Sequence, residues 1–292
     1  MTRRFAHLVN PAGVPPSSDL HAAQPVTFES IRRAKQVAER RVEVRLLSAQ
    51  YPEDDGIIPG FFERTPPLQR SILDLGAFRP PRKLPLIQDI IERLRDHAGD
   101  ADFLIYSNAD IALMPGFYVA VDRLLDEGAD ALIINRRTIR PVYTKAEDIE
   151  LMYAQAGRVH PGFDCIVFTP EVASKIRLHE LCVGIPRFYR GLCLNVAAFA
   201  RKLAVHRDLH LTFHLGNDMI WVRRAYRQYA RHNRDEYRRV LRDLEQQIGP
   251  IRDHPAAHGM RLESSAAWLV RELTRAGLRG LHDRVGRWLT WI

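Results

Sequence analysis

Short apolar runs alternate with longer segments of helical periodicity through the first 140 residues, and this alternation restricts the chain to few folds. The apolar runs end at turn-forming residues, which predicts strands over residues 5–9, 42–47, 71–75, 103–106 and 129–138. The periodic segments predict helices over residues 27–40, 86–98 and 116–127. Strand and helix alternating at this spacing are typical of a mostly parallel sheet with helices on both faces. We therefore predict an α/β fold.

The first of these helices is expected to begin near residue 27. Thr27 and Ser30 offer side-chain oxygens for its N-cap, and Glu29 lies early, where the helix dipole favours an acidic group. A further strand is expected over residues 164–168, followed by a helix that starts with a proline.

The composition is that of an ordinary globular protein, with 46% hydrophobic and 27% charged residues among 292. The chain has no run of about 18 apolar residues, the length that a membrane span needs, and no signal-peptide core follows its first arginines. We expect a soluble, cytoplasmic protein. Its three cysteines, Cys165, Cys182 and Cys193, form no CxxC pair, which predicts reduced thiols in the core.

Positive charge is concentrated at the C-terminus. Residues 221–292 hold 15 arginines and 8 acidic residues, so +7 of the net charge of +8 belongs to this part. We predict a basic helical extension over residues 222–292, following a main domain over residues 1–221. The stretch 263–292 places apolar residues and arginines on separate stripes. It either packs on the main domain or lies on an anionic bilayer as a peripheral contact. Aromatic residues among its arginines are too sparse for us to expect nucleic-acid binding.

A polar triplet, Asn108-Ala109-Asp110, ends the apolar run at residues 103–106. In an extended segment the side chains of Asn108 and Asp110 project to one side, where a carboxylate can bind a hard divalent cation. The alternative is an Asx turn that merely ends the strand. Ligands of open α/β sheets bind beyond the carboxyl ends of the strands, so function is expected here.

The triplet and its flanks, "FLIYSNADIALMPGFY", resemble the Asp-X-Asp region of the glycosyltransferases with the GT-A fold, which use nucleotide-diphosphate sugars. "RKLPLIQDII" and "TFHLGNDMIW" are similar to other segments of these enzymes, and the resemblance covers about residues 5–221. It implies a GT-A-like fold and a Mn²⁺ or Mg²⁺ ion held by Asp110 and His214. It also implies donor contacts from Asn10, Arg82, Lys83, Asn108 and Asp110.

Asn108 stands where the family's motif usually has its first aspartate, so the local negative charge is lower by one. Mg²⁺ and Mn²⁺ tolerate few protein ligands when a diphosphate and waters complete the shell. The alternative reading of "RPPRK", which contains Arg82 and Lys83, is a solvated basic loop.

An inverting transfer needs a base that deprotonates the acceptor hydroxyl. Asp164 and Asp218 are the candidates, although Asp164 fits a turn before a strand and Asp218 an N-cap equally well. Trp221 and His160 are candidates for contact with the sugar or the acceptor. Their alternatives are a core tryptophan and a histidine that caps a turn.

We therefore predict a glycosyltransferase that moves a sugar from a nucleotide-diphosphate donor to a hydroxyl of a glycan, a lipid-linked or a small-molecule acceptor. The sequence lacks a GxGxxG or GxxxxGK[ST] phosphate loop and a GxSxG elbow, which argues against dinucleotide enzymes, P-loop NTPases and α/β-hydrolases. Two alternatives remain. One is a non-catalytic nucleotide-sugar or glycan-binding protein, suggested by Asn108, and the other is a nucleotidyltransferase on a similar sheet.

Overall fold

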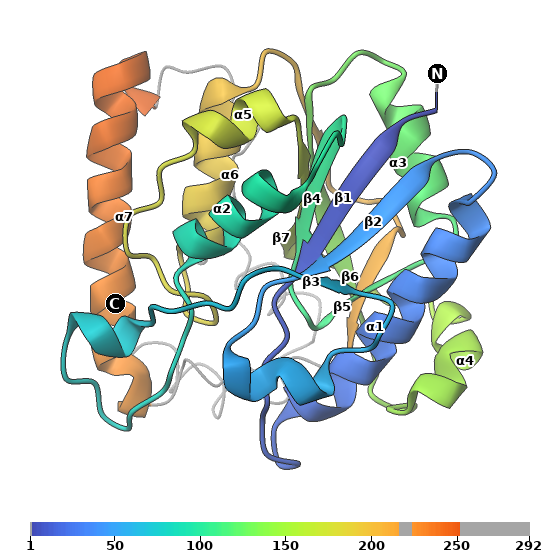
Figure 1. The fold of residues 1–292 in the computed structure, drawn as a ribbon, viewed down its shortest axis with the longest axis horizontal. Coiled ribbons are helices and arrows are strands. Elements are labelled where there is room, and N and C mark those ends of the chain that lie inside the picture. Colours follow the sequence, from blue (N-terminus) through green and yellow to red (C-terminus); the bar gives the residue numbers. More distant parts are fainter. Residues whose placement is uncertain (1, 216–223, 252–292) are drawn as a thin grey trace, which may run out of the picture.

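The computed structural model describes residues 2–215 and 224–251, and a mixed β-sheet forms its frame (Figure 1). Nine strands of this described part join in the order β3-β2-β1-β4-β7-β6-β9-β5, with β8 also paired to β6. The strands are β1 (Arg4–Val9), β2 (Glu43–Ser48), β3 (Glu63–Arg64), β4 (Phe103–Ser107), β5 (Ile111–Leu113), β6 (Ala131–Ile139), β7 (Arg158–Phe168), β8 (Leu203–His206) and β9 (Thr212–Leu215).

The direction of the strands brings several of their carboxyl ends to one edge of the sheet. β1 lies between β2 and β4 and runs parallel to both. β7 runs antiparallel to β4 and β6. Five of the eight strand pairings in the described ranges are parallel, which confirms the prediction of a mostly parallel sheet.

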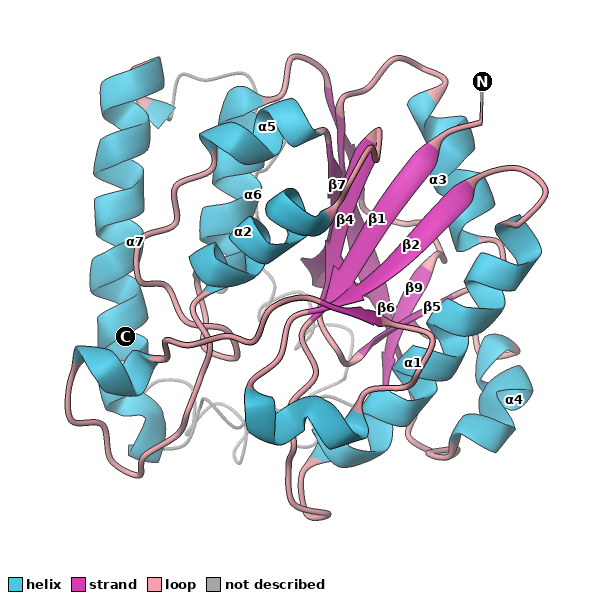
Figure 2. Ribbon diagram, in the orientation of Figure 1, coloured by secondary structure: helices cyan, strands magenta, loops and turns pink. Residues whose placement is uncertain are grey.

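Helices cover both faces of this sheet (Figure 2). They are α1 (Asp19–Ala38), α2 (Ile87–His97), α3 (Phe117–Leu125), α4 (Ile149–Tyr153), α5 (Pro170–Lys175), α6 (Phe188–Phe199) and α7 (Arg227–Ile248). One core layer contains residues of α2, α5, α6 and α7, and the other contains residues of α1 and α3. Strand residues alternate between the layers, as Leu8 and Val9 of β1 do, because successive side chains of a strand point to opposite faces. The predicted α/β fold class is confirmed.

The start of the first helix was predicted wrongly. α1 begins at Asp19, with Pro25 inside it, and Thr27 and Ser30 are buried within the helix instead of capping it. The Ser30 hydroxyl accepts a hydrogen bond from the Leu113 backbone N–H at 2.9 Å and so ties α1 to β5. Proline is unfavourable inside a helix, so the local pattern favoured a start after Pro25. Packing against the sheet outweighs this cost.

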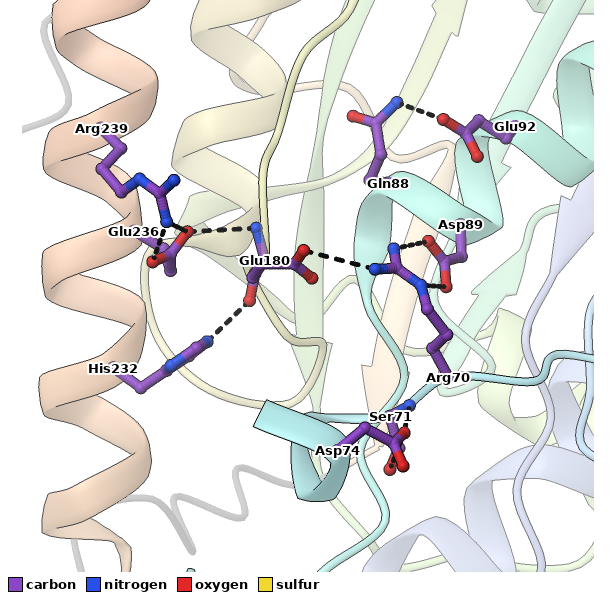
Figure 3. Close-up of polar contacts among 10 residues, drawn as sticks. All are labelled: Arg70, Ser71, Asp74, Gln88, Asp89, Glu92, Glu180, His232, Glu236 and Arg239. Carbon is purple, nitrogen blue, oxygen red and sulfur yellow. Dashed lines mark hydrogen bonds and ion pairs between the residues drawn. The ribbon is translucent and has the colours of Figure 1, made fainter. Parts of the chain in front are cut away.

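The strand predicted at residues 71–75 is a 3₁₀ turn over Ile72–Leu75. Ser71 and Asp74 form a capping box. Asp74 accepts from Ser71 N–H at 2.6 Å (Figure 3). The Ser71 hydroxyl accepts from Leu73 N–H. These local side-chain bonds satisfy the backbone groups that a sheet would otherwise pair. The apolar residues of the run alone could not reveal this.

α7, which lies in the predicted extension over 222–292, is bound to the rest of the chain by polar contacts (Figure 3). The Glu180 N–H donates to Glu236 at 3.2 Å, and His232 Nε2 donates to the Glu180 carbonyl at 2.7 Å. The Glu180 carboxylate lies 3.3 Å from Arg70, whose guanidinium also pairs with Asp89 of α2. α7 is therefore a packed element, whereas the stretch 263–292 lies outside the described residues.

Cys165, Cys182 and Cys193 are buried free thiols, as predicted. No helix within residues 2–215 and 224–251 has the length and apolar character that crossing a membrane requires.

Candidate active site

The candidate site lies where β1 and β4 end. β1 ends at Val9 and is followed by Asn10, and β4 ends at Ser107, so the polar residues that follow emerge at the same edge. The motif is not extended as expected. It forms a turn in which the Asn108 carbonyl accepts from the Ile111 N–H at 3.1 Å, and β5 begins directly after Asp110.

Asp110 lies against His214 of β9. Oδ2 of Asp110 is 3.1 Å from Nε2 of His214, and the pairing of Ile111 with His214 in the β5–β9 ladder accounts for this proximity. The Asp110 side chain is 29% exposed, and its Oδ1 atom is buried without a hydrogen-bond partner. Burial acts to raise the pKa of this carboxyl, but His214 and Arg136 outweigh it, so the pKa is lower than usual. Asp110 is thus an ionised carboxylate whose Oδ1 atom accepts no hydrogen bond from the described residues.

Asp164 enters the same site through an irregularity of β7. Cys165 pairs with Ile134 and Phe163 with Asn135, so Asp164 is the extra residue of a β-bulge. Bulges redirect side chains. Oδ2 of Asp164 lies 3.1 Å from Nη1 of Arg136, and both side chains are about nine-tenths buried.

The electrostatic surroundings of Asp164 differ from those of Asp110. Burial raises the pKa of the Asp164 carboxyl above its ordinary value, Arg136 and His214 offset this only in part, and Asp110 adds to the rise. The two carboxyls therefore have pKa values shifted in opposite directions, an arrangement that suits two different chemical roles.

His160 lies in the second irregularity of β7. Its Nδ1 accepts from the Gly162 N–H at 2.9 Å, and its Nε2 lies 3.4 Å from the Arg136 guanidinium. Burial and the neighbouring positive charges lower the pKa of His160 to about 2, so the imidazole is neutral at physiological pH. A Cβ at Gly162 would lie 2.9 Å from His160 Nδ1, so a larger residue here would displace the imidazole.

Two tyrosines that the sequence reading did not select connect these groups. The Tyr106 hydroxyl lies 3.3 Å from Oδ1 of Asn10 and 3.2 Å from Oδ1 of Asn108. The Tyr106 ring stacks on Tyr189 with 5.8 Å between centroids, and the Tyr189 hydroxyl donates to the Asp164 carbonyl. Tyr106 and Tyr189 therefore connect Asn10 and Asn108 to Asp164.

Arg136 and the tyrosines give different signals in the sequence. Tyr106 lies in the motif's own strand, and Arg136 is a charged residue in the apolar strand β6, so each could have been noticed. Tyr189 is the second residue of an ordinary apolar helix, α6, and gives no such signal.

Arg82 and Lys83 contact residues outside the group around Asp110. The Lys83 ammonium is 2.5 Å from Glu53 and 3.9 Å from the centre of the Tyr51 ring, both of which follow β2. The Arg82 N–H donates to the Tyr229 hydroxyl at 2.8 Å, and its side chain is exposed. Neither residue contacts Asp110, and Lys83 already has an acidic partner.

Asp218 and Trp221 lie outside the described residues. Of the other candidates, Asp110, Asp164, His160 and His214 come together, and Asn10 and Asn108 join them through Tyr106.

In residues 2–215 and 224–251, no group of three or more His, Cys, Asp or Glu side chains has the geometry of a metal site. Asp110 and His214 form a pair. A carboxylate and an imidazole suit Mn²⁺, and the buried Oδ1 of Asp110 has an unused lone pair for a hard cation. The pair fits an ion whose remaining ligands come from a diphosphate and water.

Comparison with known proteins found no matching family model and no matching curated protein. Solved structures resemble the fold. TarS of S. aureus, residues 1–349 in complex with UDP-GlcNAc, aligns at 10% identity and a TM-score of 0.49 over 87% of this chain and 69% of that chain. This chain spans 41% of a longer TarS structure, at a TM-score of 0.48 and 9% identity.

Glucosyl-3-phosphoglycerate synthase of Mycobacterium tuberculosis, in complex with Mg²⁺ and UDP, aligns at 15% identity and a TM-score of 0.45 over 85% of this chain and 80% of that chain. Both proteins were crystallised with a nucleotide or a nucleotide sugar. With TM-scores below 0.5, these likenesses carry no conclusion about what this chain binds. At these identities the likeness concerns the fold, and the candidate site is defined by the residues of this chain.

Proposed function

We propose that the chain is a glycosyltransferase that moves a sugar from a nucleotide-diphosphate donor to an acceptor hydroxyl with the help of Mn²⁺ or Mg²⁺. One observation carries the proposal. At the edge where β1 and β4 end, a carboxylate with an unused oxygen, Asp110, lies in one electrostatic cluster with a second carboxylate of raised pKa, Asp164.

Asp110 and His214 would hold the metal on the donor side. When bound, the ion supplies positive charge that stabilises the departing nucleoside diphosphate. The low pKa of Asp110 keeps the carboxylate ionised and ready for a cation. Asn108 and Asn10, both next to the Tyr106 hydroxyl, are proposed to contact the nucleotide, together with Arg82 and Lys83.

Asp164 is the proposed base. Its carboxylate accepts the proton of the acceptor hydroxyl as the hydroxyl oxygen attacks the anomeric carbon. The bond from that carbon to the diphosphate oxygen breaks, and the sugar is transferred with inversion. A raised pKa makes the ionised carboxylate a stronger base. The neutral His160 beside Arg136 provides a polar wall for the sugar or the acceptor.

Asp218 is the proposed second candidate for the base, and Trp221 is proposed to contact the sugar. We place the transferase in residues 1–221 and treat residues 222–292 as an extension. The acceptor remains a glycan, a lipid-linked or a small-molecule hydroxyl compound.

A thermal-shift screen with UDP-, GDP- and CMP-sugars, each with and without Mn²⁺, tests the proposal. A ligand that binds only the native state raises the unfolding midpoint. We expect one class of donor to raise it, and to do so more strongly with Mn²⁺. Metal-dependent hydrolysis of that donor then separates an enzyme from a non-catalytic binding protein. If no donor shifts the midpoint with or without Mn²⁺, the proposed function is wrong.

A further inference from the structure

Four arginines gather where the first turn of α6 meets α7. Arg187 and Arg190 belong to the start of α6, and Arg234 and Arg238 lie one turn apart on α7, the helix beside it in Figure 2. The Arg190 guanidinium is 5.9 Å from the centre of the Tyr237 ring. Burial, together with the charges of Arg234, Arg190 and Arg238, lowers the pKa of Arg187, as expected for like charges held close. We call these four residues the arginine cluster.

Acidic partners do not balance the cluster. Asp235 lies 3.2 Å from both Arg234 and Arg238 and is shared between them. Arg187 and Arg190 form no ion pair with any residue that the structure describes. Like charges placed together destabilise a fold unless something compensates them. Within residues 2–215 and 224–251, at least two positive charges of the cluster thus have no ion-pair partner.

The backbone at this point adds to the positive potential. Arg187 is the N-cap residue of α6, makes no side-chain capping bond and has a left-handed φ of 88°. Helices prefer Ser, Thr, Asp or Asn at this position, and left-handed backbone is unfavourable for a residue with a long side chain. The first turn of α6 therefore keeps uncapped N–H groups, which attract anions.

The cluster adjoins the proposed acceptor side of the site. Tyr189 lies between Arg187 and Arg190 in the sequence, and it is the residue whose ring stacks on Tyr106 and whose hydroxyl bonds to the Asp164 carbonyl. The first turn of α6 thus carries both the cluster and the tyrosine that contacts the proposed base.

We propose that the arginine cluster binds a phosphate group of the acceptor while the acceptor's hydroxyl lies near Asp164. Guanidinium groups form paired hydrogen bonds to phosphate oxygens, and a phosphate dianion uses several of them together with helix N–H groups. This inference rests on the proposed function, because it assigns the substrate class of that same site. The acceptor is a phosphate-bearing hydroxyl compound, either water-soluble or a lipid headgroup.

Calorimetric titration of the full chain with glycerol 1-phosphate tests the cluster directly, with glycerol as the uncharged control probe. Metal and nucleotide are both left out, so that no diphosphate competes with the probe for the arginines. The double variant R187Q/R190Q is compared with R40Q/R123Q. This control removes two exposed arginines on the other face of the sheet, one in the turn after α1 and one in α3. The two variants lose the same charge.

We expect R187Q/R190Q to bind glycerol 1-phosphate at least about 10-fold more weakly than the control variant, since each charge-assisted bond contributes about that factor. R187K/R190K keeps the charge and should recover part of the affinity, and equal unfolding midpoints show that the variants are folded. Vesicles of phosphatidylglycerol in phosphatidylcholine form a second arm. A loss confined to vesicles identifies a lipid headgroup as the source of the phosphate.

If neither probe distinguishes R187Q/R190Q from R40Q/R123Q, the inference is wrong, whether or not the wild-type chain binds a nucleotide sugar. Donor binding by the wild-type chain is measured in parallel. Phosphate binding that depends on the cluster, in a chain that binds no nucleotide sugar, would refute the proposed function and leave the anion site intact.

Discussion

Oδ2 of Asp110 lies 3.1 Å from Nε2 of His214, a residue 104 positions further along the chain. The β5–β9 ladder brings them together, because Ile111 pairs with His214. Asp110, in the turn after β4, therefore lies beside His214 of β9 at the edge where β1 and β4 end. Asp110 and His214 are the basis of the proposed metal site.

Replacing His214 by alanine should weaken Mn²⁺ binding in the presence of a nucleoside diphosphate by about 10- to 100-fold, because the ion loses an imidazole neighbour and Asp110 loses its orienting partner. His210→Ala is the matched control, since His210 is a half-buried histidine four positions earlier in the chain. Titration of Mn²⁺ by calorimetry measures both. Equal weakening in the two variants would show that His214 has no special role.

Replacing Asp164 by asparagine should reduce kcat by about 100- to 10,000-fold, because a general base contributes that much to proton transfer. Donor affinity should change little, since the proposed donor contacts lie elsewhere. Asp208→Asn, at a carboxylate that is 82% exposed, is the control. Steady-state transfer kinetics provide the measurement, and a variant with full kcat would move the role of base to Asp218.

Arg136 sets the pKa of the proposed base. Its positive charge lowers the pKa of the Asp164 carboxyl, which burial raises. Arg136→Met should therefore raise that pKa further and move the acidic limb of kcat/KM to higher pH, because the carboxylate must be ionised to act. Arg136→Lys retains the charge and should shift the limb less. The profile of kcat/KM against pH is the measurement. If the acidic limb does not move in Arg136→Met, the ion pair between Arg136 and Asp164 does not control catalysis.

Buried neutral histidines should make the protein sensitive to acid. Burial lowers the pKa of His7 to about 3, and its ring nitrogens contact the Tyr118 and Ser107 hydroxyls at 2.7 and 2.8 Å. Between about pH 6.5 and 3 the unfolded chain binds a proton at His7 that the folded chain does not, so stability falls as the pH falls. Each such proton costs about 1.4 kcal/mol per pH unit.

His7→Gln should be about 1–3 kcal/mol less stable than the wild type at pH 7, because it disturbs buried hydrogen bonds. Between pH 6 and pH 4.5 its free energy of unfolding should also fall less steeply than that of the wild type, by about 1.4 kcal/mol per pH unit, because the unfolded chain no longer binds a proton at position 7. Urea unfolding at several pH values measures both quantities. If the free energy of unfolding depends on pH equally in the two proteins, the low pKa assigned to His7 is wrong.

The sequence predicted the elements whose signals are local. The run at residues 103–106 and the turn residues after it are enough to place Asp110 at the end of a strand. The helix start at residue 27 was wrong because Pro25 dominates the local pattern. The hydrogen bond that Ser30 accepts comes from β5, 83 residues away, and no local pattern reveals it. The strand at 71–75 was wrong because two side-chain hydrogen bonds close a 3₁₀ turn.

The candidate site was predictable in the types of its residues and less so in their arrangement. Asp164 and His160 were selected from a Pro/Gly-containing segment, but only the register of β6 and β7 reveals the bulges that bring them to Arg136. Tyr189 reaches the site through the packing of α6, which no local pattern encodes. Residues that act through long-range packing are the ones that a single sequence leaves out.

Asp110 is proposed to hold a cation that it shares with the donor's diphosphate. The most direct measurement is the affinity of the wild type and of Asp110→Asn for the nucleoside diphosphate of the responding donor, with and without Mn²⁺, by calorimetry. The account predicts that Mn²⁺ tightens binding to the wild type and that Asp110→Asn, while still folded, loses this gain. An equal gain from Mn²⁺ in both proteins would contradict it.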